Sequence, residues 1–492
     1  MTCCSNKLVS IYKPRKPEKT VLHDAIRRNF NKWCHQKDAE HESSYHSQKV
    51  FSAYLKCGIP AHGFARAHCG KCNRDFFIPF SCKRRGVCPS CNQKRMVECA
   101  AHISDTLFPL VPARQWVISF PKRIRPFFKT QKIKAQVLKI VVEEIERQIM
   151  RCSSDLSNAR TGGISFFQCF GAKLNYHPHF HLCYVDGVFL NQLDTLQFSQ
   201  ALITPDDIQD TEDQIRKRVL KLFGRKKWIE KSEIEEMLKW ENSGFSLNAS
   251  VRIEPFDRPA LERLLRYCAR PPFVSENLKW NRDILVYRFP KVSQDGLSSI
   301  QLTPLEFLDK IAVLLPQPRS HLQHYHGVFA SNAPLRKKIT AHANKLVEEH
   351  IPEIVQEAPT PKTKSYSWAK LLARIYEVFP LICTCGEAMK IIAFITNPHM
   401  ARQILSHLKF CNNPFDPLPC EPEEWENGSQ IPVNTIEWEN SSQLVPEIIS
   451  DFSKQYTYDY VQEPEYEMSQ LVPGTEDGFP APYVEPLWFD SS

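Results

Sequence analysis

Residues 175–189, with the sequence NYHPHFHLCYVDGVF, place two histidines on one face of a predicted strand. Side chains two residues apart share a face of an extended strand, so His179 and His181 point to one side while Phe180 points to the other, into a core. The β-branched and aromatic residues that follow favour a strand, and Asp186-Gly187 predicts a hairpin turn. The segment therefore aims two imidazoles at one point near the end of a strand.

Two imidazoles in this arrangement are typical of a divalent metal site. A single histidine on a strand is more often a hydrogen-bonded structural residue, but here His177 lies two residues before His179 and is a candidate third ligand. Nitrogen ligands suit several divalent ions, so the pattern does not choose among metals. Taken alone it would also fit a cupin-like metalloenzyme, and the rest of the chain must decide the class.

A second metal pattern lies in residues 61–98. Cys69-Gly-Lys-Cys72 and Cys88-Pro-Ser-Cys91 are two Cys-x-x-Cys pairs separated by 15 residues, an arrangement that can close a tetrahedral zinc site. We predict one structural Zn²⁺ held by these four cysteines, with Cys82 or His68 able to replace one of them. Zinc is preferred to disulfides because a chain without a signal-peptide hydrophobic region is expected in the reducing cytoplasm.

Charge is distributed unevenly along the 492 residues. Residues 411–492 contain 17 Asp or Glu and one Lys, a net charge of −16, so residues 1–410 contain 62 Lys or Arg against 38 Asp or Glu, a net charge of +24. A body this basic favours a phosphate-rich partner, although a well-solvated surface would also fit. No apolar run approaches the ~18–20 residues that span a bilayer, so no membrane partner is expected.

Hydrophobic periodicity predicts an α+β fold. A strand at 115–120, a long helix after Lys132 and a strand at 163–170 precede the histidine strand, which favours an antiparallel sheet with flanking helices, preceded by a small zinc-binding module and followed by a disordered acidic tail. The expected organisation is a helical arm (1–60), a zinc-binding domain (61–98), a core (99–300) with a basic amphipathic insertion near 204–240 beside the histidines, an extension (301–358), a helical, cysteine-containing segment (365–410) and the tail (411–492).

With these features in place, the chain resembles the IS91-type transposases, in the single-tyrosine, ISCR-like branch of the HUH superfamily of single-strand nucleases. The resemblance extends over roughly residues 12–408 and follows the order of the family's motifs. The matching segments are Ala61–Arg66, Ser81–Gly86, Cys88–Cys91, Arg114–Val117, His177–His181, Asp186–Phe189, Leu264–Pro272, His324–Phe329 and Trp368–Ala373.

The resemblance implies an HUH-type core and a covalent mechanism. A divalent metal, Mg²⁺ or Mn²⁺, held by the histidine pair would polarise a scissile phosphate of single-stranded DNA at an element end, and a tyrosine would attack it to form a 5′-phosphotyrosine. Rejoining of strands would then give rolling-circle-like transposition. The implied nucleophile is Tyr267, near the C-terminal end of a predicted helix capped by Asp257; Tyr287, on a predicted strand, is the alternative.

Basic residues near both motifs are the candidate DNA contacts, because guanidinium groups bind phosphate well. They are Lys83, Arg84 and Arg85 in the zinc-binding domain and Arg263, Arg266 and Arg270 around Tyr267. The expected partners are single-stranded element ends and target DNA, with self-association if one tyrosine per chain must make two cuts. The expected location is the cytoplasm, with the nucleoid.

Two questions stay open at this stage. The family usually has Cys-Pro-x-Cys where this chain has Cys383-Thr-Cys385, so a second zinc site there would need distant ligands such as His399 or Cys411. The other function classes are a replication initiator that nicks without transposing, and a non-catalytic zinc-ribbon DNA binder in which the histidines are structural. A covalent adduct with 5′-DNA separates an enzyme from a binder, and joining of two different ends separates a transposase from an initiator.

The charge asymmetry generates a prediction for the tail. Deletion of residues 411–492 removes a net charge of −16 and is expected to tighten binding to non-specific DNA at low salt, with the difference shrinking as salt screens it. Fluorescence anisotropy over a salt series measures this. Equal affinities of the two proteins at low salt would show that the tail does not compete with DNA.

Overall fold

The computed structural model describes residues 16–40, 45–153, 158–192, 195–290, 292, 296–341, 383, 385, 387 and 389–407. Its α-helices are α1 (Val21–Ala39), α2 (Tyr45–Lys56), α3 (Pro89–His102), α4 (Gln131–Arg151), α5 (Pro205–Arg225), α6 (Lys231–Leu238), α7 (Arg258–Cys268), α8 (Pro304–Leu314) and α11 (Pro398–His407). A π-helical turn, Ile103–Leu107, continues α3, and shorter 3₁₀ turns lie at Pro17–Lys19, Pro60–His62, Lys122–Lys129, Glu241–Gly244 and Ser275–Asn277.

The described strands form four antiparallel sheets. The largest has the order β13-β4-β5-β3-β8, with β9 also paired to β3, and the histidine strand β5 lies at its centre between β4 and β3. Its strands are β3 (Ala113–Ser119), β4 (Gly162–Phe170), β5 (Tyr176–Val185), β8 (Ser246–Asn248), β9 (Arg252–Ile253) and β13 (Gln323–Gly327). The smaller sheets combine β1 (Phe64–Cys69), β2 (Arg74–Pro79) and β14 (Lys390–Ile395); β10 (Leu278–Asn281), β11 (Ile284–Arg288) and β12 (Ser299–Leu302); and β6 (Gly187–Gln192) with β7 (Thr195–Gln200).

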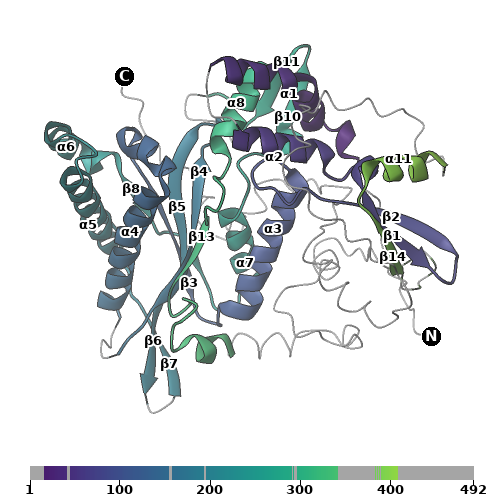
Figure 1. The fold of residues 1–492 in the computed structure, drawn as a ribbon. Coiled ribbons are helices and arrows are strands. Elements are labelled where there is room, and N and C mark those ends of the chain that lie inside the picture. The colour runs from purple at the N-terminus through teal and green to yellow at the C-terminus, as the bar shows by residue number, and fades with distance from the viewer. Residues whose placement is uncertain are drawn as a thin grey trace.

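Alternation along the central strands creates two faces of different character. Trp116, Phe180 and Tyr184 point to the face covered by α4 and α5, where they join the largest apolar cluster (Figure 1). The opposite face carries the histidines and packs beneath α7 and α3. The core is therefore three-layered, helix–sheet–helix, which confirms the predicted α+β class and the antiparallel sheet.

The basic stretch at 204–240 does not lie beside the histidines as expected. It forms α5 and α6, and α5 packs on α4 through Ile215, Val219 and Phe223, on the opposite face of the sheet. Part of its positive charge is already neutralised within the fold, since Arg218 pairs with Glu143 and Glu144 of α4. The stretch is a structural layer of the core, because the apolar side of α5 covers the α4 face of the sheet.

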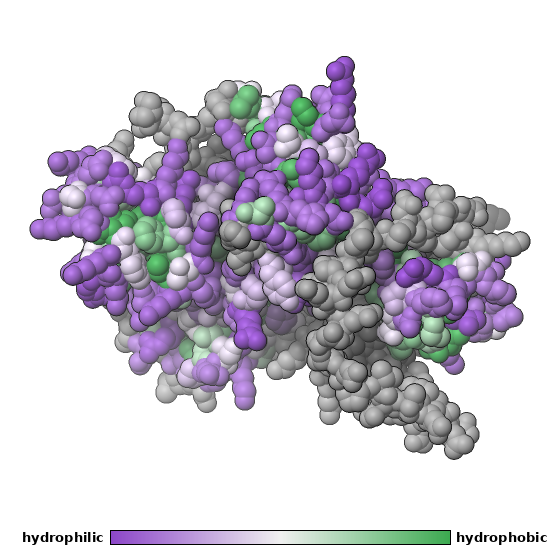
Figure 2. Space-filling model, turned by 45° about the horizontal axis from the view of Figure 1, so that its top comes forward, coloured by the Kyte–Doolittle hydropathy of each residue, from purple (hydrophilic) through white to green (hydrophobic). Residues whose placement is uncertain are grey.

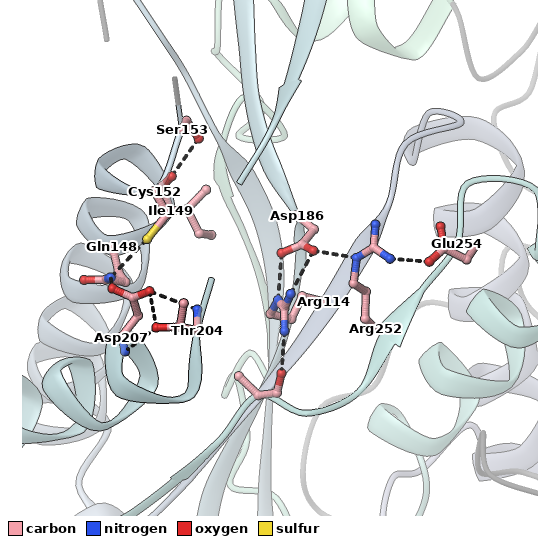
Figure 3. A network of polar contacts seen from close by, with 11 residues as sticks. Arg114, Gln148, Ile149, Cys152, Ser153, Asp186, Thr204, Asp207, Arg252 and Glu254 are labelled. Atoms are coloured by element: carbon pink, nitrogen blue, oxygen red, sulfur yellow. Dashed lines mark hydrogen bonds and ion pairs between the residues drawn. The ribbon is translucent and has the colours of Figure 1, made fainter. Parts of the chain in front are cut away.

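Asp186-Gly187 is not the hairpin turn that the sequence predicted. Strand β6 leaves the central sheet and pairs with β7, and Gly187 is required there because a Cβ would lie 2.2 Å from the Ser199 carbonyl oxygen. The Asp186 carboxylate is fully buried and accepts hydrogen bonds from Arg114 Nε at 2.7 Å and Arg252 Nε at 2.9 Å (Figure 3). Asp186 therefore anchors β5, β3 and β9 together.

The two predicted N-terminal helices are α1 and α2, and they pack against α8 and the β10-β11-β12 sheet. Trp33, Phe51 and Phe307 belong to a shared apolar cluster with the β10-β11-β12 sheet, and the Trp33 indole N–H donates to Asp309 at 2.8 Å. Tyr287 lies in this cluster, 2% exposed, and its hydroxyl accepts from the Val274 N–H at 3.4 Å. Tyr287 is thus a buried residue of this apolar cluster, with its hydroxyl bound to the backbone.

Strand β14 and helix α11 return from the far end of the chain to the N-terminal module. β14 pairs with β1 along most of its length, from Phe64↔Ile395 to His68↔Lys390, and α11 packs Ala401 and Leu405 against Phe64. Figure 1 shows this module beside α2 and apart from the central sheet. The predicted helix at 368–378 and the acidic tail lie outside the described residues.

The face of the molecule that Figure 2 shows is largely polar, with apolar residues gathered in a few small patches. Among the described helices, none is long and apolar enough to cross a bilayer.

The buried carboxylate of Asp186 generates a stability prediction. Asp186→Ala leaves Arg114 (side chain 11% exposed) without its counter-charge and is expected to lower the free energy of unfolding by about 3–5 kcal/mol. Glu254→Ala removes only the exposed partner of Arg252 and is expected to cost less than about 1 kcal/mol. Urea denaturation monitors both, and equal losses in the two variants would contradict the anchoring role.

Candidate active site and zinc clusters

The three histidines of β5 line up on one buried face, as the strand periodicity predicted. His177, His179 and His181 are 6%, 4% and 0% exposed, and adjacent rings are 5.3 Å and 4.9 Å apart, centre to centre. The His179 Nδ1 lies 2.8 Å from the His177 carbonyl oxygen, so Nδ1–H donates and the lone pair falls on Nε2. His179 is thereby prepared to ligate through Nε2.

His181 is oriented by an amide on the neighbouring strand. Gln115 Nε2 lies 3.0 Å from His181 Nδ1, and His181 Nε2 is buried with no hydrogen-bond partner. If the Gln115 amide is rotated by 180°, its Oε1 accepts a hydrogen bond from the His181 Nδ1–H. The lone pair of His181 Nε2 is then available to a cation. A buried, unpartnered ring nitrogen next to a second imidazole fits a metal site.

Burial keeps these imidazoles neutral. It lowers the pKa of His179 to about 4 and that of His181 well below its usual range, and the positive charge of Arg270 acts in the same direction on both. Burial also lowers the pKa of His177 to about 2, with His179 and Arg125 contributing. Neutral imidazoles near pH 7 are the form that binds metal.

Tyr267 is brought to the histidines by α7. Asp257 caps the helix by accepting from the Ala260 N–H at 2.9 Å, and Leu261, Leu264 and Cys268 pack onto the histidine face. The Tyr267 ring lies edge-on to the His181 ring, 5.4 Å between centres. The structure thus combines the predicted histidine pair and the predicted tyrosine in one place.

Gln168 connects the sheet to the C-terminal end of α7. It lies opposite His179 in the β4–β5 register, and its Nε2 donates to the carbonyl oxygens of Tyr267 at 3.0 Å and Cys268 at 2.8 Å. The Gln168 Oε1 is buried and has no hydrogen-bond partner. This oxygen is a further potential ligand beside the histidines.

Arg270 is the predicted DNA contact whose guanidinium lies over the tyrosine ring. Its guanidinium carbon lies 4.5 Å from the centre of the Tyr267 ring and 5.3 Å from that of Phe170. Arg266 instead pairs with Glu262 at 2.9 Å, and Arg263 is half-buried. Of the three predicted arginines on this segment, Arg270 has the position of an anion-binding group.

A cleft of about 920 Å³ borders the candidate site, although neither the three histidines nor Tyr267 belongs to its described wall. Gln168, Cys268 and Arg270 belong to its wall, together with Phe170 and Tyr176. Its described wall contains only Asp309 as an acidic residue, against the basic residues Lys37, Arg85, Arg95, Lys129, Lys134, Arg270 and Arg319. Aromatic rings interleaved with cations are suited to a nucleic-acid strand.

The predicted contacts in the zinc-binding domain divide between this cleft and the surface. Arg85 lines the cleft and donates from Nη1 to the Ser320 carbonyl oxygen at 2.7 Å. Lys83 and Arg84 are exposed. Lys134 lines the cleft, and burial lowers its pKa to about 8. Cys169 opposes this shift, and the charge of Arg85 adds to it.

The single zinc site predicted from two Cys-x-x-Cys pairs is wrong in its grouping. Cys88 and Cys91, at the start of α3, lie with Cys57 and Cys82, whereas Cys69 and Cys72 lie with Cys383 and Cys385. Within each group all four sulfurs lie within 4.8 Å of one another. The pairs separate because the β1–β2 hairpin carries Cys69 and Cys72 away from the first turn of α3. His68 is not in either group and instead contacts Asp75 at 2.9 Å.

The Cys57 group has the dimensions of a zinc centre. A tetrahedral site with Zn–S bonds of about 2.3 Å places its sulfurs about 3.8 Å apart. The Cys57–Cys88, Cys82–Cys91 and Cys57–Cys91 sulfur separations are 3.4, 3.6 and 3.8 Å. Hydrogen bonds among the thiols, and then burial, hold the pKa of Cys57 well above its ordinary value, a state that a divalent cation would reverse. The residues fit a structural Zn²⁺.

Sequence reasoning missed several residues that the fold brings to these sites. Gln115 and Gln168 gave no signal, since their role depends on strand register. Cys57 is isolated in sequence from the other cysteines, and its pairing with Cys88 spans 31 residues. The sequence prediction did include Cys88 and Cys91 as zinc ligands and Cys82 as a spare ligand, so Cys57 is the member of this cluster that it missed.

Comparisons with known families agree with this organisation. A model described as "Transposase zinc-binding domain" matches residues 25–120, and one described as "Putative transposase" matches residues 162–337. No curated protein and no solved structure was found to be similar to the chain. The first match contains the Cys57 group, and the second contains β4, β5 and α7, with the histidines and Tyr267.

The zinc cluster, the basic cleft and the two matched domains all point to a DNA-processing enzyme with an N-terminal zinc-binding domain. With that domain followed by the transposase domain, the chain belongs to the IS91-type transposases.

Proposed function

We propose that the chain cleaves and rejoins single-stranded DNA through Tyr267 and a metal held by His179 and His181. The observation that carries this proposal is the edge-on contact of Tyr267 with His181, beside two buried acceptor atoms that have no hydrogen-bond partner, His181 Nε2 and Gln168 Oε1. A structural tyrosine would not require a neighbouring imidazole and amide to remain unsatisfied.

The donor set defines how a divalent metal would be held. His179 Nε2 and His181 Nε2 supply nitrogen, and Gln168 Oε1 supplies the hard oxygen that Mg²⁺ and Mn²⁺ favour. Gln168 is preferred to His177 as the third ligand because its oxygen is buried without a partner and lies opposite His179 in register. When bound, such an ion supplies Lewis-acid polarisation of the scissile phosphate.

The protein residues perform the remaining tasks. The Tyr267 oxygen attacks phosphorus and loses its proton as the O–P bond forms, while the P–O3′ bond breaks and the departing 3′ oxygen gains a proton. Arg270, with its guanidinium over the tyrosine ring, offsets negative charge on the phosphate. The 5′-phosphotyrosine conserves the bond energy, so attack by a 3′-OH reverses the step and joins strands without ATP.

The cleft provides a path for the strand. Its basic residues would contact phosphates, and Phe170 and Tyr176 would offer faces for base stacking. A strand in this cleft would lie next to the tyrosine helix, because Cys268 and Arg270 form part of the wall. The strand would therefore approach the site from this side of the sheet, away from α5.

The nucleophile is tested with a conservative substitution. Tyr267→Phe is expected to abolish the covalent protein–DNA adduct while leaving metal binding unchanged, because only the attacking oxygen is removed. Incubation with single-stranded element ends and Mn²⁺, followed by denaturing electrophoresis, detects the adduct. Tyr287→Phe is the matched control and should retain it. An adduct that persists in Tyr267→Phe and disappears in Tyr287→Phe would mean that the nucleophile has been wrongly chosen.

The third ligand is tested separately. Gln168→Ala is expected to weaken Mn²⁺ binding by roughly 10-fold or more, whereas His177→Ala should change it much less. Calorimetric titration of the metal measures both, with His181→Ala as the reference for a lost ligand. The reverse order of effects would assign the position to His177.

The second candidate function is a replication initiator with the same chemistry. The matched "Putative transposase" model favours transposition. Joining of two different DNA ends in a single reaction supports the transposase, while nicking and resealing of one strand only supports the initiator.

A further inference from the structure

One group of four described cysteines has no part in the proposed reaction or in the Cys57 group. Cys69 is the last residue of β1, and Cys72 lies in the turn into β2. Cys383 and Cys385 precede β14, more than 300 residues later in the chain. The match to the zinc-binding domain ends at residue 120, so it does not include Cys383 or Cys385. The group therefore needs an explanation of its own.

The dimensions of this group are those of a tetrahedral metal site. The Cys69–Cys385 and Cys72–Cys383 sulfur separations are 3.6 Å and 3.8 Å, close to the about 3.8 Å expected around Zn²⁺ with four thiolates. These separations far exceed the about 2.05 Å of a disulfide bond. Each pair joins one cysteine from the hairpin to one from the returning segment, so the set is complete only when both ends of the chain meet.

Backbone contacts position the four cysteines. Asn73, with φ of 53°, turns the chain from Cys72 into β2, and the Cys383 N–H donates to the Glu387 carbonyl oxygen at 2.8 Å. β14 then pairs with β1, whose last residue is Cys69. A small apolar cluster of Ala65, Ala67, Ile78 and Met389 surrounds the buried Cys69 and Cys383. Soft thiolates in such a setting select zinc over hard cations.

We propose that Cys69, Cys72, Cys383 and Cys385 bind a second structural Zn²⁺ that fastens residues 383–407 to the N-terminal zinc-binding domain. The zinc-binding domain is thereby discontinuous in sequence, with β14 and α11 as integral parts of it. A metal that joins segments 311 residues apart closes a very long loop, where a crosslink restricts the unfolded chain most. The Cys-Thr-Cys spacing at Cys383 is sufficient because the hairpin supplies the other two ligands.

The proposal predicts two zinc ions per chain and assigns each to a different group. Zinc content of the purified full-length protein, measured by mass spectrometry of the metal, should be two in the wild type. It should fall to one in Cys383→Ser/Cys385→Ser, to one in Cys88→Ser/Cys91→Ser, and to none in the combination. Cys34→Ser is the matched control, since Cys34 is partly exposed and outside both groups. Each protein is also measured with His181→Ala to subtract zinc held by the histidines.

Hydrogen exchange provides a readout that does not depend on metal content. Cys383→Ser/Cys385→Ser should lose protection in β14 and keep it in α3 and β5, whereas Cys88→Ser/Cys91→Ser should lose it in α3. Retained protection in β5 shows that the core remains folded in each variant. The proposal would be overturned if the wild type contained one zinc ion and Cys383→Ser/Cys385→Ser contained the same amount. It would also be overturned if Cys69→Ser and Cys88→Ser each released the same single zinc ion. Neither result depends on DNA cleavage, so the nuclease proposal stands or falls separately.

Discussion

The candidate active site depends on one constraint, the antiparallel register of β4, β5 and β3. Pairing of Gln168 with His179 and of Val117 with His181 fixes which side chains share the face beneath α7. A one-residue slip would move both imidazoles into the apolar layer under α4 and exchange them for Phe180. The fully buried Asp186, held by Arg114 and Arg252, ties together the strands that set this register. Stability and chemistry are thus linked at the end of β5.

Helix α7 packs on the histidine face of the sheet, yet it leaves polar atoms of that face without hydrogen-bond partners. α7 packs through leucines and Cys268, and Gln168 binds the carbonyl oxygens at its C-terminal end. This contact holds the Tyr267 backbone at a fixed height above the histidines. The Gln168 oxygen and the His181 Nε2 are left unsatisfied in a buried setting, which costs about 1–3 kcal/mol each unless a ligand compensates. A cation bound at the proposed site would therefore stabilise the fold.

The two cysteine groups have different structural consequences. The Cys57 group joins the end of α2 to the start of α3 and lies in the apolar cluster shared with α8 and the β10-β11-β12 sheet. Arg85, on the loop before Cys88, enters the cleft beside the proposed strand path. The second group acts on the outer sheet, where β14 and α11 complete the module. Zinc would therefore organise one wall of the cleft from one centre and the outer module from the other.

The sequence alone determined the features that depend on local patterns. These are the shared face of His179 and His181, the α7 helix with its Asp257 cap, the helices α1 and α2, and the α+β class, because periodicity and capping act over a few residues. Tertiary structure decided the rest. Cys88 lies with Cys57 and not with Cys69, α5 covers the far face of the sheet, and Asp186 forms a buried ion pair in place of a turn. The ligand groups and the amides of Gln115 and Gln168 come together only through strand pairing between distant segments, and no short-range pattern in a sequence encodes such pairing.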